Sequence, residues 1–428
     1  MNIKKYLKLI SILPVILITA SCVGEEPNDI GYVTALGIDK SNDGYNYTIQ
    51  FANPTKISGG ASEEGGSGEN IVENIVVESP NIYMAVSNAD SIISKDLSLS
   101  HAKILVVSEE VAREGVRSIA DTIARNNDIR PDIYIAVAEN AKEYLEGVKP
   151  VIELNPVKYY QLIYENKKGE AIPQNNAREF YVSCVSQGKD CVLPLAGVAE
   201  TDTEDKGGST DAGTSKSSGD DQQPKENKKN KDAQISNTDF QSGTKNYYAG
   251  EAGVEIRNKS ETMGLAVFKN DKYIGKLGSH DAEIYNILTG HINGSKTTFY
   301  SGDTRPVTVK LEEKEKPDIT IDKDNKSVRV NIKLESELLS APEEDYEPDS
   351  QIPDKASGEM IDNVAENFLN KLYNKMGVDV LGIRGRLRRF FLTTKSYDEY
   401  IKDFNPNEWT FTVNTDFIMK RTGMTYYY

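Results

Sequence analysis

Residues 103–138 read KILVVSEEVAREGVRSIADTIARNNDIRPDIYIAVA, in which two short apolar runs flank an amphipathic stretch. The first run, KILVV, predicts a buried strand, and Ser108 after it can cap a helix that begins with two glutamates. One face of this helix is apolar and carries Val111, Val116, Ile119, Ala120, Ile123 and Ala124. Pro131 marks the end of the helix, and IYIAVA predicts a second strand. A strand, a helix and a strand in this order predict an α/β layered domain.

The same alternation continues on both sides of this stretch. Residues 32–38 (YVTALGI) and 45–51 (YNYTIQF) are rich in β-branched and aromatic residues and are separated by an Asp-Gly turn. This pattern predicts a hairpin, and IVENIVVES after it predicts a further strand. Residues 81–95 and 140–146 predict helices. We therefore expect residues 22–199 to form an N-terminal mixed α/β domain.

The second half of the chain has a different pattern. Residues 263–277 (MGLAVFKNDKYIGKL) predict a hairpin, and PVTVKL and DITID predict two strands. Residues 326–338 alternate apolar and polar side chains, which is typical of a strand with one solvated face. A helical stripe over 361–376 ends at Gly377, and 409–419 alternate again. These patterns predict an antiparallel sheet with helices, so that the whole protein is of the α+β class.

Length and composition predict two or three domains in these 428 residues. Residues 200–245 consist mainly of Ser, Gly, Asp, Lys, Gln and Asn. Their few large apolar side chains cannot offset the entropy of ordering, so we expect a disordered polar linker. The C-terminal α+β region then covers 246–428, either as one unit or as two subdomains at 246–305 and 306–428.

The first 21 residues have the three parts of a secretory signal peptide. Lys4, Lys5 and Lys8 precede a short apolar run, and two small residues lie directly before Cys22. The run is shorter than the about 20 apolar residues that a spanning helix needs. Small residues before a cysteine resemble a bacterial lipobox, although Thr19 replaces the usual aliphatic residue. We expect a diacylglycerol lipid on Cys22; the alternative is an ordinary signal peptide that is cut near a cysteine.

The overall charge limits the classes of partner. The chain has 66 acidic and 50 basic residues and a formal net charge of −16. A protein that binds duplex nucleic acid needs clustered lysines and arginines, so nucleic acid is not expected as a partner. The same charge provides no general attraction to anionic lipid, and a membrane anchor would therefore depend on the acyl chains.

Two further cysteines, Cys184 and Cys191, lie in SCVSQGKDC on either side of Gly188, which we interpret as a hairpin turn. Outside the cytoplasm such a pair can close a disulfide, and two unpaired thiols are the alternative. A zinc site is disfavoured because the spacing lacks a second ligand pair and the chain has 3 histidines. No metal site is expected.

Four arginines are concentrated in IRGRLRRFF, at Arg384, Arg386, Arg388 and Arg389. Inside an acidic protein this group could contact lipid headgroups or an acidic loop of a partner. The alternative is that the arginines pair with carboxylates of this same chain.

The sequence contains no recognisable catalytic constellation. His101, His280 and His291 lie in unrelated contexts, and His101 before a buried strand is interpreted as a structural histidine. No Gly-x-Ser-x-Gly motif or triad partner is present. We therefore expect a protein that is not an enzyme.

Five motifs occur in one order behind Cys22: VTALGIDKSNDGYNYTIQFANP, LSLSHAKILVVSEEVAREGVRSIADTIARNNDIR, GLAVFKNDKYIGKL, VDVLG and a late segment with the single Trp. Together they resemble the Ger(x)C family, the lipoprotein C subunits of bacterial spore germinant receptors. The resemblance covers nearly the whole mature chain. It implies a non-enzymatic receptor component on the outer face of the spore inner membrane, beside membrane-spanning A and B subunits. It implies no cofactor apart from the lipid.

Two other functions would leave different patterns in the sequence. A solute-binding lipoprotein of a transporter would have two similar α/β lobes around a cleft, whereas the two halves of this chain differ in pattern. A lipid-anchored hydrolase of cell-wall material would show a paired acid and base or a metal cluster, and none emerges from the sequence.

Overall fold

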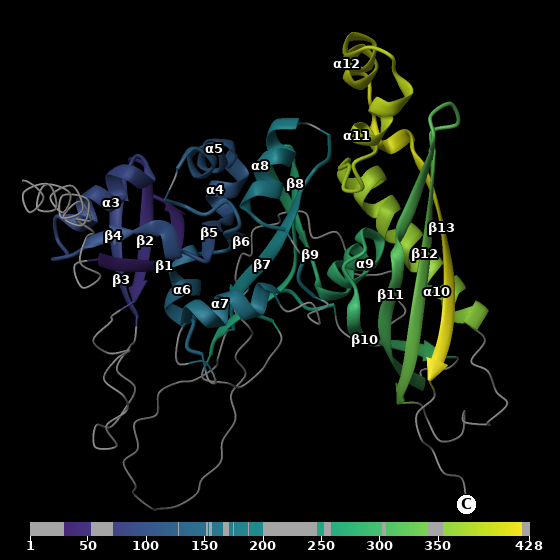
Figure 1. Ribbon diagram of the computed structural model, residues 1–428, viewed down its shortest axis with the longest axis horizontal. Coiled ribbons are helices and arrows are strands. Elements are labelled where there is room, and N and C mark those ends of the chain that lie inside the picture. Colours follow the sequence, from purple (N-terminus) through teal and green to yellow (C-terminus); the bar gives the residue numbers. More distant parts are fainter. Residues whose placement is uncertain are drawn as a thin grey trace, which may run out of the picture.

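The computed structural model describes residues 30–52, 72–126, 128–150, 153, 156–165, 171–173, 175–186, 188–199, 246–251, 258–301, 305–340 and 354–421. Within this part of the chain, a nine-stranded sheet and a four-stranded sheet lie toward opposite ends of an elongated molecule (Figure 1). The signal peptide, Cys22 and residues 200–245 lie outside the described residues. The α+β class expected from the sequence is confirmed.

The first sheet has the strand order β3-β2-β1-β5-β6-β7-β8-β9, and β4 pairs with β1. Its strands are β1 (Ile30–Lys40), β2 (Tyr45–Ala52), β3 (Val72–Ser79), β4 (Asp96–Ser98), β5 (Ile104–Ser108), β6 (Tyr134–Ala138), β7 (Val192–Val198), β8 (Ser260–Lys269) and β9 (Lys272–Leu277). The central strands β1, β5, β6 and β7 are parallel to one another, and β4 also pairs parallel with β1. The strands β2, β3, β8 and β9 pair antiparallel. The predicted β1–β2 hairpin is confirmed, with Leu36 opposite Ile49.

Helices cover both faces of this sheet, because successive side chains of its strands point to opposite sides. Leu105 and Val107 of β5 belong to one hydrophobic core, and Ile104 and Val106 belong to another. The helices of the first domain are α3 (Ile82–Asp90), η1 (Leu99–His101), α4 (Glu109–Glu114), α5 (Arg117–Arg125), α6 (Ala141–Gly147), α7 (Pro156–Glu165) and α8 (Ala177–Ser186). Residues of α3, α4, α5 and α8 line the first core, and residues of α6 and α7 line the second.

The amphipathic stretch after β5 forms two helices instead of the one that its apolar face predicts. Ser108 caps α4 as expected, since its hydroxyl accepts a hydrogen bond from the Val111 N–H. The helix then stops at Gly115, whose φ of +122° is not helical. A Cβ atom at Gly115 would lie 2.8 Å from Asp271 Oδ2, so the break also lets the β8–β9 turn approach closely. Ala124, which the single-helix pattern placed on the apolar face, is exposed.

The second sheet has the order β10-β11-β12-β13. Its strands are β10 (Asn293–Ser301), β11 (Arg305–Asp322), β12 (Ser327–Ser340) and β13 (Thr410–Arg421). The helices beside it are α9 (Ser279–Thr289), α10 (Asp354–Asn370), the π-helical turn η3 (Lys371–Met376), α11 (Ile383–Leu387), η4 (Arg388–Phe390), α12 (Thr394–Lys402) and η5 (Pro406–Glu408). As predicted, the long helical stripe ends at Gly377, which adopts a left-handed conformation.

Two features of the second sheet differ from the expectation. Strand β13 pairs parallel with β12, with Val413 opposite Val330, so this sheet is not wholly antiparallel. The segments PVTVKL and DITID are parts of one long strand, β11. Because β10 pairs with β11, a subdomain boundary between 305 and 306 would divide a hairpin. The alternation of apolar residues predicts a strand but does not fix the direction of its partner.

The sheet of the N-terminal part includes two strands from the C-terminal part of the chain. These are β8 and β9, which follow the 200–245 segment in the sequence. Ala266 and Phe268 of β8 pack into the N-terminal core, while Leu265 and Val267 pack into the C-terminal core. The expected division at residue 246 therefore does not coincide with a boundary between the sheets. The 200–245 segment connects two paired strands, since Val198 of β7 lies opposite Ser260 of β8.

Candidate functional site

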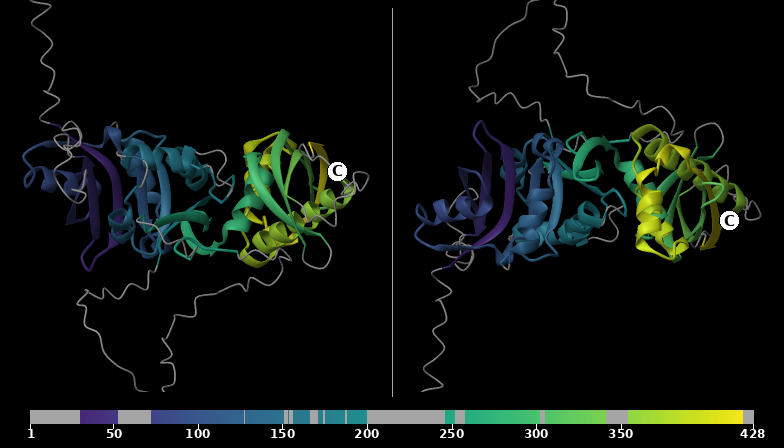
Figure 2. Two further views of the ribbon diagram at one scale, coloured as in Figure 1. Left: turned by 90° about the horizontal axis from the view of Figure 1, so that it is seen from below. Right: turned by 90° about the horizontal axis from the view of Figure 1, so that it is seen from above.

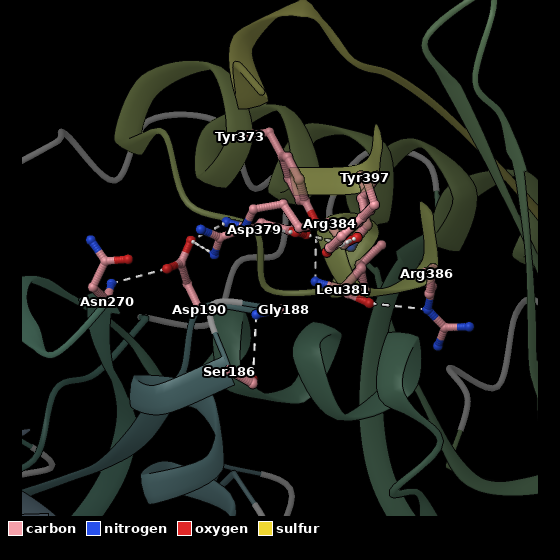
Figure 3. Close-up of polar contacts among 11 residues, drawn as sticks. Ser186, Gly188, Asp190, Asn270, Tyr373, Asp379, Leu381, Arg384, Arg386 and Tyr397 are labelled. Carbon is pink, nitrogen blue, oxygen red and sulfur yellow. Dashed lines mark hydrogen bonds and ion pairs between the residues drawn. The ribbon is translucent and has the colours of Figure 1, made fainter. Parts of the chain in front are cut away.

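A group of buried charged residues joins the two domains beside the start of β7 (Figure 3). The first domain contributes Asp190, which is 2% exposed and directly precedes Cys191 and β7. The C-terminal domain contributes Asp379, which is 0% exposed, and Arg384 of α11. We call these three residues, together with Tyr373 of η3, the charged joint.

Backbone and side-chain groups of the two aspartates bind each other reciprocally. The Asp190 N–H donates to the Asp379 carbonyl at 2.8 Å, and the Asp379 N–H donates to Asp190 Oδ2 at 2.8 Å. Asp190 Oδ1 also accepts from the Asn270 N–H at 3.0 Å. The joint thus connects the β8–β9 turn, the start of β7 and the segment before α11.

Arg384 supplies the positive charge of the joint. Its Nη2 lies 2.8 Å from Asp190 Oδ2, and its Nε lies 3.3 Å from Asp379 Oδ2. Asp379 also accepts hydrogen bonds at 2.8 Å from the backbone N–H groups of Ile383 and Arg384, at the first turn of α11. A carboxylate at this end of a helix satisfies N–H groups that have no partner within the helix.

The phenol of Tyr373 completes the hydrogen bonds of Asp379. Its hydroxyl donates to Asp379 Oδ1 at 2.5 Å and accepts from the Leu381 N–H at 3.0 Å. Burial, with Asp379 beside it, raises the pKa of Tyr373 well above its usual range, which keeps the phenol protonated as a donor.

Burial sets the electrostatics of the joint, and the partners counteract it. Burial raises the pKa of Asp379, although the hydrogen bond from Tyr373, the backbone N–H groups and the Arg384 charge lower it in part. Burial alone would lower the pKa of Arg384, but the charges of Asp190 and Asp379 outweigh it and raise this pKa. Removal of one partner of such a buried pair is costly because it leaves a charge without compensation.

A close approach of two glycines brings the backbones together next to the aspartates. The Gly385 N–H donates to the Gly188 carbonyl at 2.8 Å. A Cβ atom at Gly385 would lie 3.1 Å from that same oxygen. The chemistry of the joint is therefore that of a fixed connection: its polar groups are directed at one another and hold the two domains in one relative orientation.

The structure separates the four arginines that the sequence groups together. Arg384 is the one that pairs with carboxylates of its own chain. Arg386 Nε donates to the Leu381 carbonyl at 3.2 Å, and Arg388 Nη1 donates to the Phe391 carbonyl at 2.8 Å. Arg389 is exposed, with its guanidinium 5.0 Å from the Phe390 ring centre.

Cys184 and Cys191 are free, buried thiols. Cys184 lies on α8 and Cys191 directly before β7, so SCVSQGKDC is not the predicted hairpin turn. Burial raises the pKa of each thiol to about 12, and both are therefore protonated at neutral pH.

The three histidines lie apart, as their sequence contexts indicate. The Nδ1 of His101 is 3.0 Å from the Ser100 hydroxyl, and that of His291 is 2.9 Å from the Thr289 hydroxyl. His280 Nδ1 lies 3.7 Å from Glu283. Among the described residues, no group of three or more His, Cys, Asp or Glu side chains could hold a metal ion.

A hollow of about 100 Å³, partly open to solvent, lies within the first domain. Apolar side chains of the sheet and of α5 line it, including Leu36, Leu105, Ile119 and Ile123. It does not lie between the two domains, where the charged joint is found. A cleft between two similar lobes, as a solute-binding lipoprotein of a transporter requires, is therefore not supported.

Neither Asp190 nor Asp379 is expected as a site residue from the sequence. The available signal is the run VDVLG, in which a carboxylate is surrounded by apolar residues that predict burial. A buried carboxylate requires partners, and Arg384 shortly after it is a candidate. Asp190 has no comparable signal, because its partners are far away in the sequence.

Both halves of the chain match models of spore germination proteins. The model described as "Spore germination protein N-terminal domain" matches residues 24–198. The model described as "Spore germination B3/ GerAC like, C-terminal" matches residues 263–423. The chain therefore belongs to the Ger(x)C family, the C subunits of spore germinant receptors.

Individual relatives match over shorter stretches. Spore germination protein KC of Bacillus subtilis (strain 168) is 28% identical over 141 residues, which are 32% of this chain and 35% of the relative. The putative spore germination protein YfkR of the same strain is 29% identical over 136 residues, 31% of this chain and 35% of the relative. The chain thus matches about a third of the length of each.

A solved structure, the crystal structure of the GerBC protein, aligns with a TM-score of 0.47 at 14% identity. The alignment covers 90% of this chain and 96% of the other. Within the described part of this chain, no helix is both long and apolar enough to cross a bilayer.

Proposed function

We propose that this protein is a non-enzymatic, lipid-anchored component of a nutrient-sensing germination receptor. The observation that carries the proposal is the match of two spore germination models in order, over residues 24–198 and 263–423. A single matched domain can occur in a protein that has another function. Two consecutive domains of one family support the role of the whole family member.

The proposed anchor is a diacylglycerol group on Cys22, and its support comes from the sequence. Lysines, an apolar run and small residues precede this cysteine in the order of a lipoprotein signal. Two or more acyl chains hold a soluble body stably on a bilayer, because each buried CH₂ group contributes about 0.8 kcal/mol. Export would place the protein on the outer face of the spore inner membrane.

The proposed partners are the membrane-spanning A and B subunits of the receptor. Tethering confines the protein to a thin layer above the bilayer and so raises its effective concentration for such partners. The charged joint supports a scaffolding role, since buried ion pairs and hydrogen bonds connect the two domains. Arg389, exposed beside Phe390, is a candidate contact with an acidic loop of a partner.

The test is to replace Cys22 by Ala and to follow two germination routes separately. Nutrient-triggered germination is expected to be lost, whereas germination that bypasses the receptors should continue. Ser21→Ala is a matched control, since it keeps a small residue before the cysteine. Normal nutrient germination of the Cys22→Ala strain would refute the proposed anchor, and normal germination of a deletion strain would refute the receptor role.

A further inference from the structure

The surface of α3 and of residues 91–94 after it carries no exposed charge. Every exposed residue between 80 and 94 is uncharged, although 27% of the whole chain is charged. Asp90, the one charged residue in this range, is half-buried, and its Oδ1 accepts a hydrogen bond from the Leu97 N–H at 2.9 Å. The charge of Asp90 is thus used within the fold.

Large apolar side chains are exposed on the same segment. Tyr83 and Met84 in the first turn of α3 are 51% and 48% exposed, and Ile92 after the helix is 72% exposed. Single exposed apolar residues are normal on protein surfaces. A group of them on a short helix and the loop after it, without exposed charges and with a tyrosine among them, is typical of a surface at the level of lipid headgroups. We call this surface, defined by Tyr83, Met84 and Ile92, the α3 face.

The strand pairing places the α3 face beside the start of the described chain. Ile30, the first residue of β1, pairs with Asp96 of β4, and Gly31 pairs with Leu97. The loop that carries Ile92 leads directly into β4. Eight residue steps separate Cys22 from Ile30, and at about 3.5 Å per residue they span at most about 28 Å. A lipid on Cys22 therefore keeps this end of the molecule close to the bilayer.

The helix α3 and the strand β4 lie at one end of the long axis of the molecule. Figure 1 shows α3 and β4 at the left and the four-stranded sheet at the right, and both views of Figure 2 agree. If the end with α3 rests on a membrane, the C-terminal domain is directed away from it.

We propose that the α3 face rests on the lipid bilayer, with Tyr83, Met84 and Ile92 among the headgroups and upper acyl chains. This inference depends on the proposed anchor at Cys22. The anchor alone permits any orientation within reach of the chain. The anchor and the α3 face together fix which end of the protein lies at the membrane.

The test uses the full-length lipidated protein in vesicles of phosphatidylethanolamine and phosphatidylglycerol that contain brominated lipid and no other protein. A fluorophore is attached to Met84→Cys or Ile92→Cys. The matched control is Leu392→Cys in the C-terminal domain, where the native side chain is 102% exposed. Cys184 and Cys191 are buried and do not compete for the label in the folded protein.

Brominated lipid should quench the probes at positions 84 and 92 and leave the probe at 392 at its unquenched intensity. If the protein floats with the vesicles while the probes at 84 and 92 are not quenched, the membrane contact of the α3 face is refuted and the anchor stands. Equal quenching at 392 would also refute the proposed orientation. If the protein does not float with the vesicles, both the anchor and the membrane contact of the α3 face are refuted. Quenching at 84 and 92 that appears only after the A and B subunits are added would show that the partners, and not the α3 face, set the orientation, which overturns the proposal.

Discussion

Asp190 and Asp379 bind each other across the boundary between the two domains through two hydrogen bonds of 2.8 Å, one in each direction. Each residue uses its own N–H as donor, and Arg384 lies against both carboxylates. The relation explains why these acidic residues tolerate nearly complete burial. It also explains why the two domains can act as one body although each has its own sheet.

Replacement of Arg384 by Met should destabilise the protein strongly. It leaves the carboxylates of Asp190 and Asp379 buried without a cation, for which about 3–5 kcal/mol is expected. Urea unfolding measures the loss. Arg389→Met is the matched control, since Arg389 is exposed and its change should stay within about 0.5 kcal/mol. Equal effects of the two substitutions would contradict the role of the joint.

Replacement of Tyr373 by Phe should also weaken the joint, by about 1–3 kcal/mol, because the Leu381 N–H and Asp379 lose a buried partner. Tyr397→Phe is the control. Its hydroxyl donates one hydrogen bond of 2.9 Å to the Arg384 carbonyl from a half-buried position. The unfolding midpoint of Tyr373→Phe should be clearly the lower of the two; the opposite order would contradict the assignment.

The buried thiols predict a loss of stability at alkaline pH. In the folded protein the pKa of Cys184 and of Cys191 is about 12, whereas an unfolded cysteine has a pKa of about 8.5. Above about pH 8.5 the unfolded state releases protons that the folded state retains. The free energy of unfolding therefore falls as pH rises, by up to about 1.4 kcal/mol per pH unit for each thiol.

Denaturation at pH 8 and pH 10 tests this slope. A variant with Cys184→Ala and Cys191→Ala should lose less stability between the two pH values than the native protein, while buried tyrosines affect both alike. A thiol reagent should label both cysteines only after unfolding. Parallel pH profiles would contradict the prediction, and an absence of reactive thiols at positions 184 and 191 after unfolding would instead indicate a disulfide.

Gly115→Ala should destabilise the protein by about 1–3 kcal/mol, because φ of +122° is strained for any residue with a Cβ atom. The new methyl group would also meet Asp271 Oδ2 at 2.8 Å. Gly275→Ala is a suitable control, since the nearest atom there is the flexible end of Met376 at 3.3 Å. Thermal unfolding of the two variants compares them; a stabilised Gly115→Ala protein would show that α4 and α5 prefer to be one helix.

Much of the fold is predictable because burial and local turn chemistry act over short stretches. The β1–β2 hairpin, the Ser108 cap and the end of the long helix at Gly377 follow from residues that are neighbours in sequence. The close approach at Gly115 is not predictable in this way, since Asp271 belongs to a turn that is distant in sequence. The parallel direction of β13 and the membership of β8 in the first sheet are likewise set by distant partners.

The charged joint is likewise predictable from the sequence only in part. Arg384 stands out in the sequence as one of four arginines, but its partner Asp190 is separated from it by almost two hundred residues. A charge that is paired across two domains looks, in the sequence, like a charge on the surface. The cysteines show the converse, because residues that are close in sequence are not bonded to each other. Cys184 lies on α8 and Cys191 lies directly before β7, and both thiols are free.

The pairing of Val198 with Ser260 has a practical consequence for this chain. The Ala199 N–H donates to the Lys259 carbonyl at 2.7 Å, so the segment between β7 and β8 begins and ends at neighbouring points of one sheet. Doubling the length of a loop whose ends are held together adds only about 0.6 kcal/mol to the entropic cost of closing it. A fluorescent reporter or an affinity tag inserted there should leave the paired ends of β7 and β8, and the cores beside them, intact.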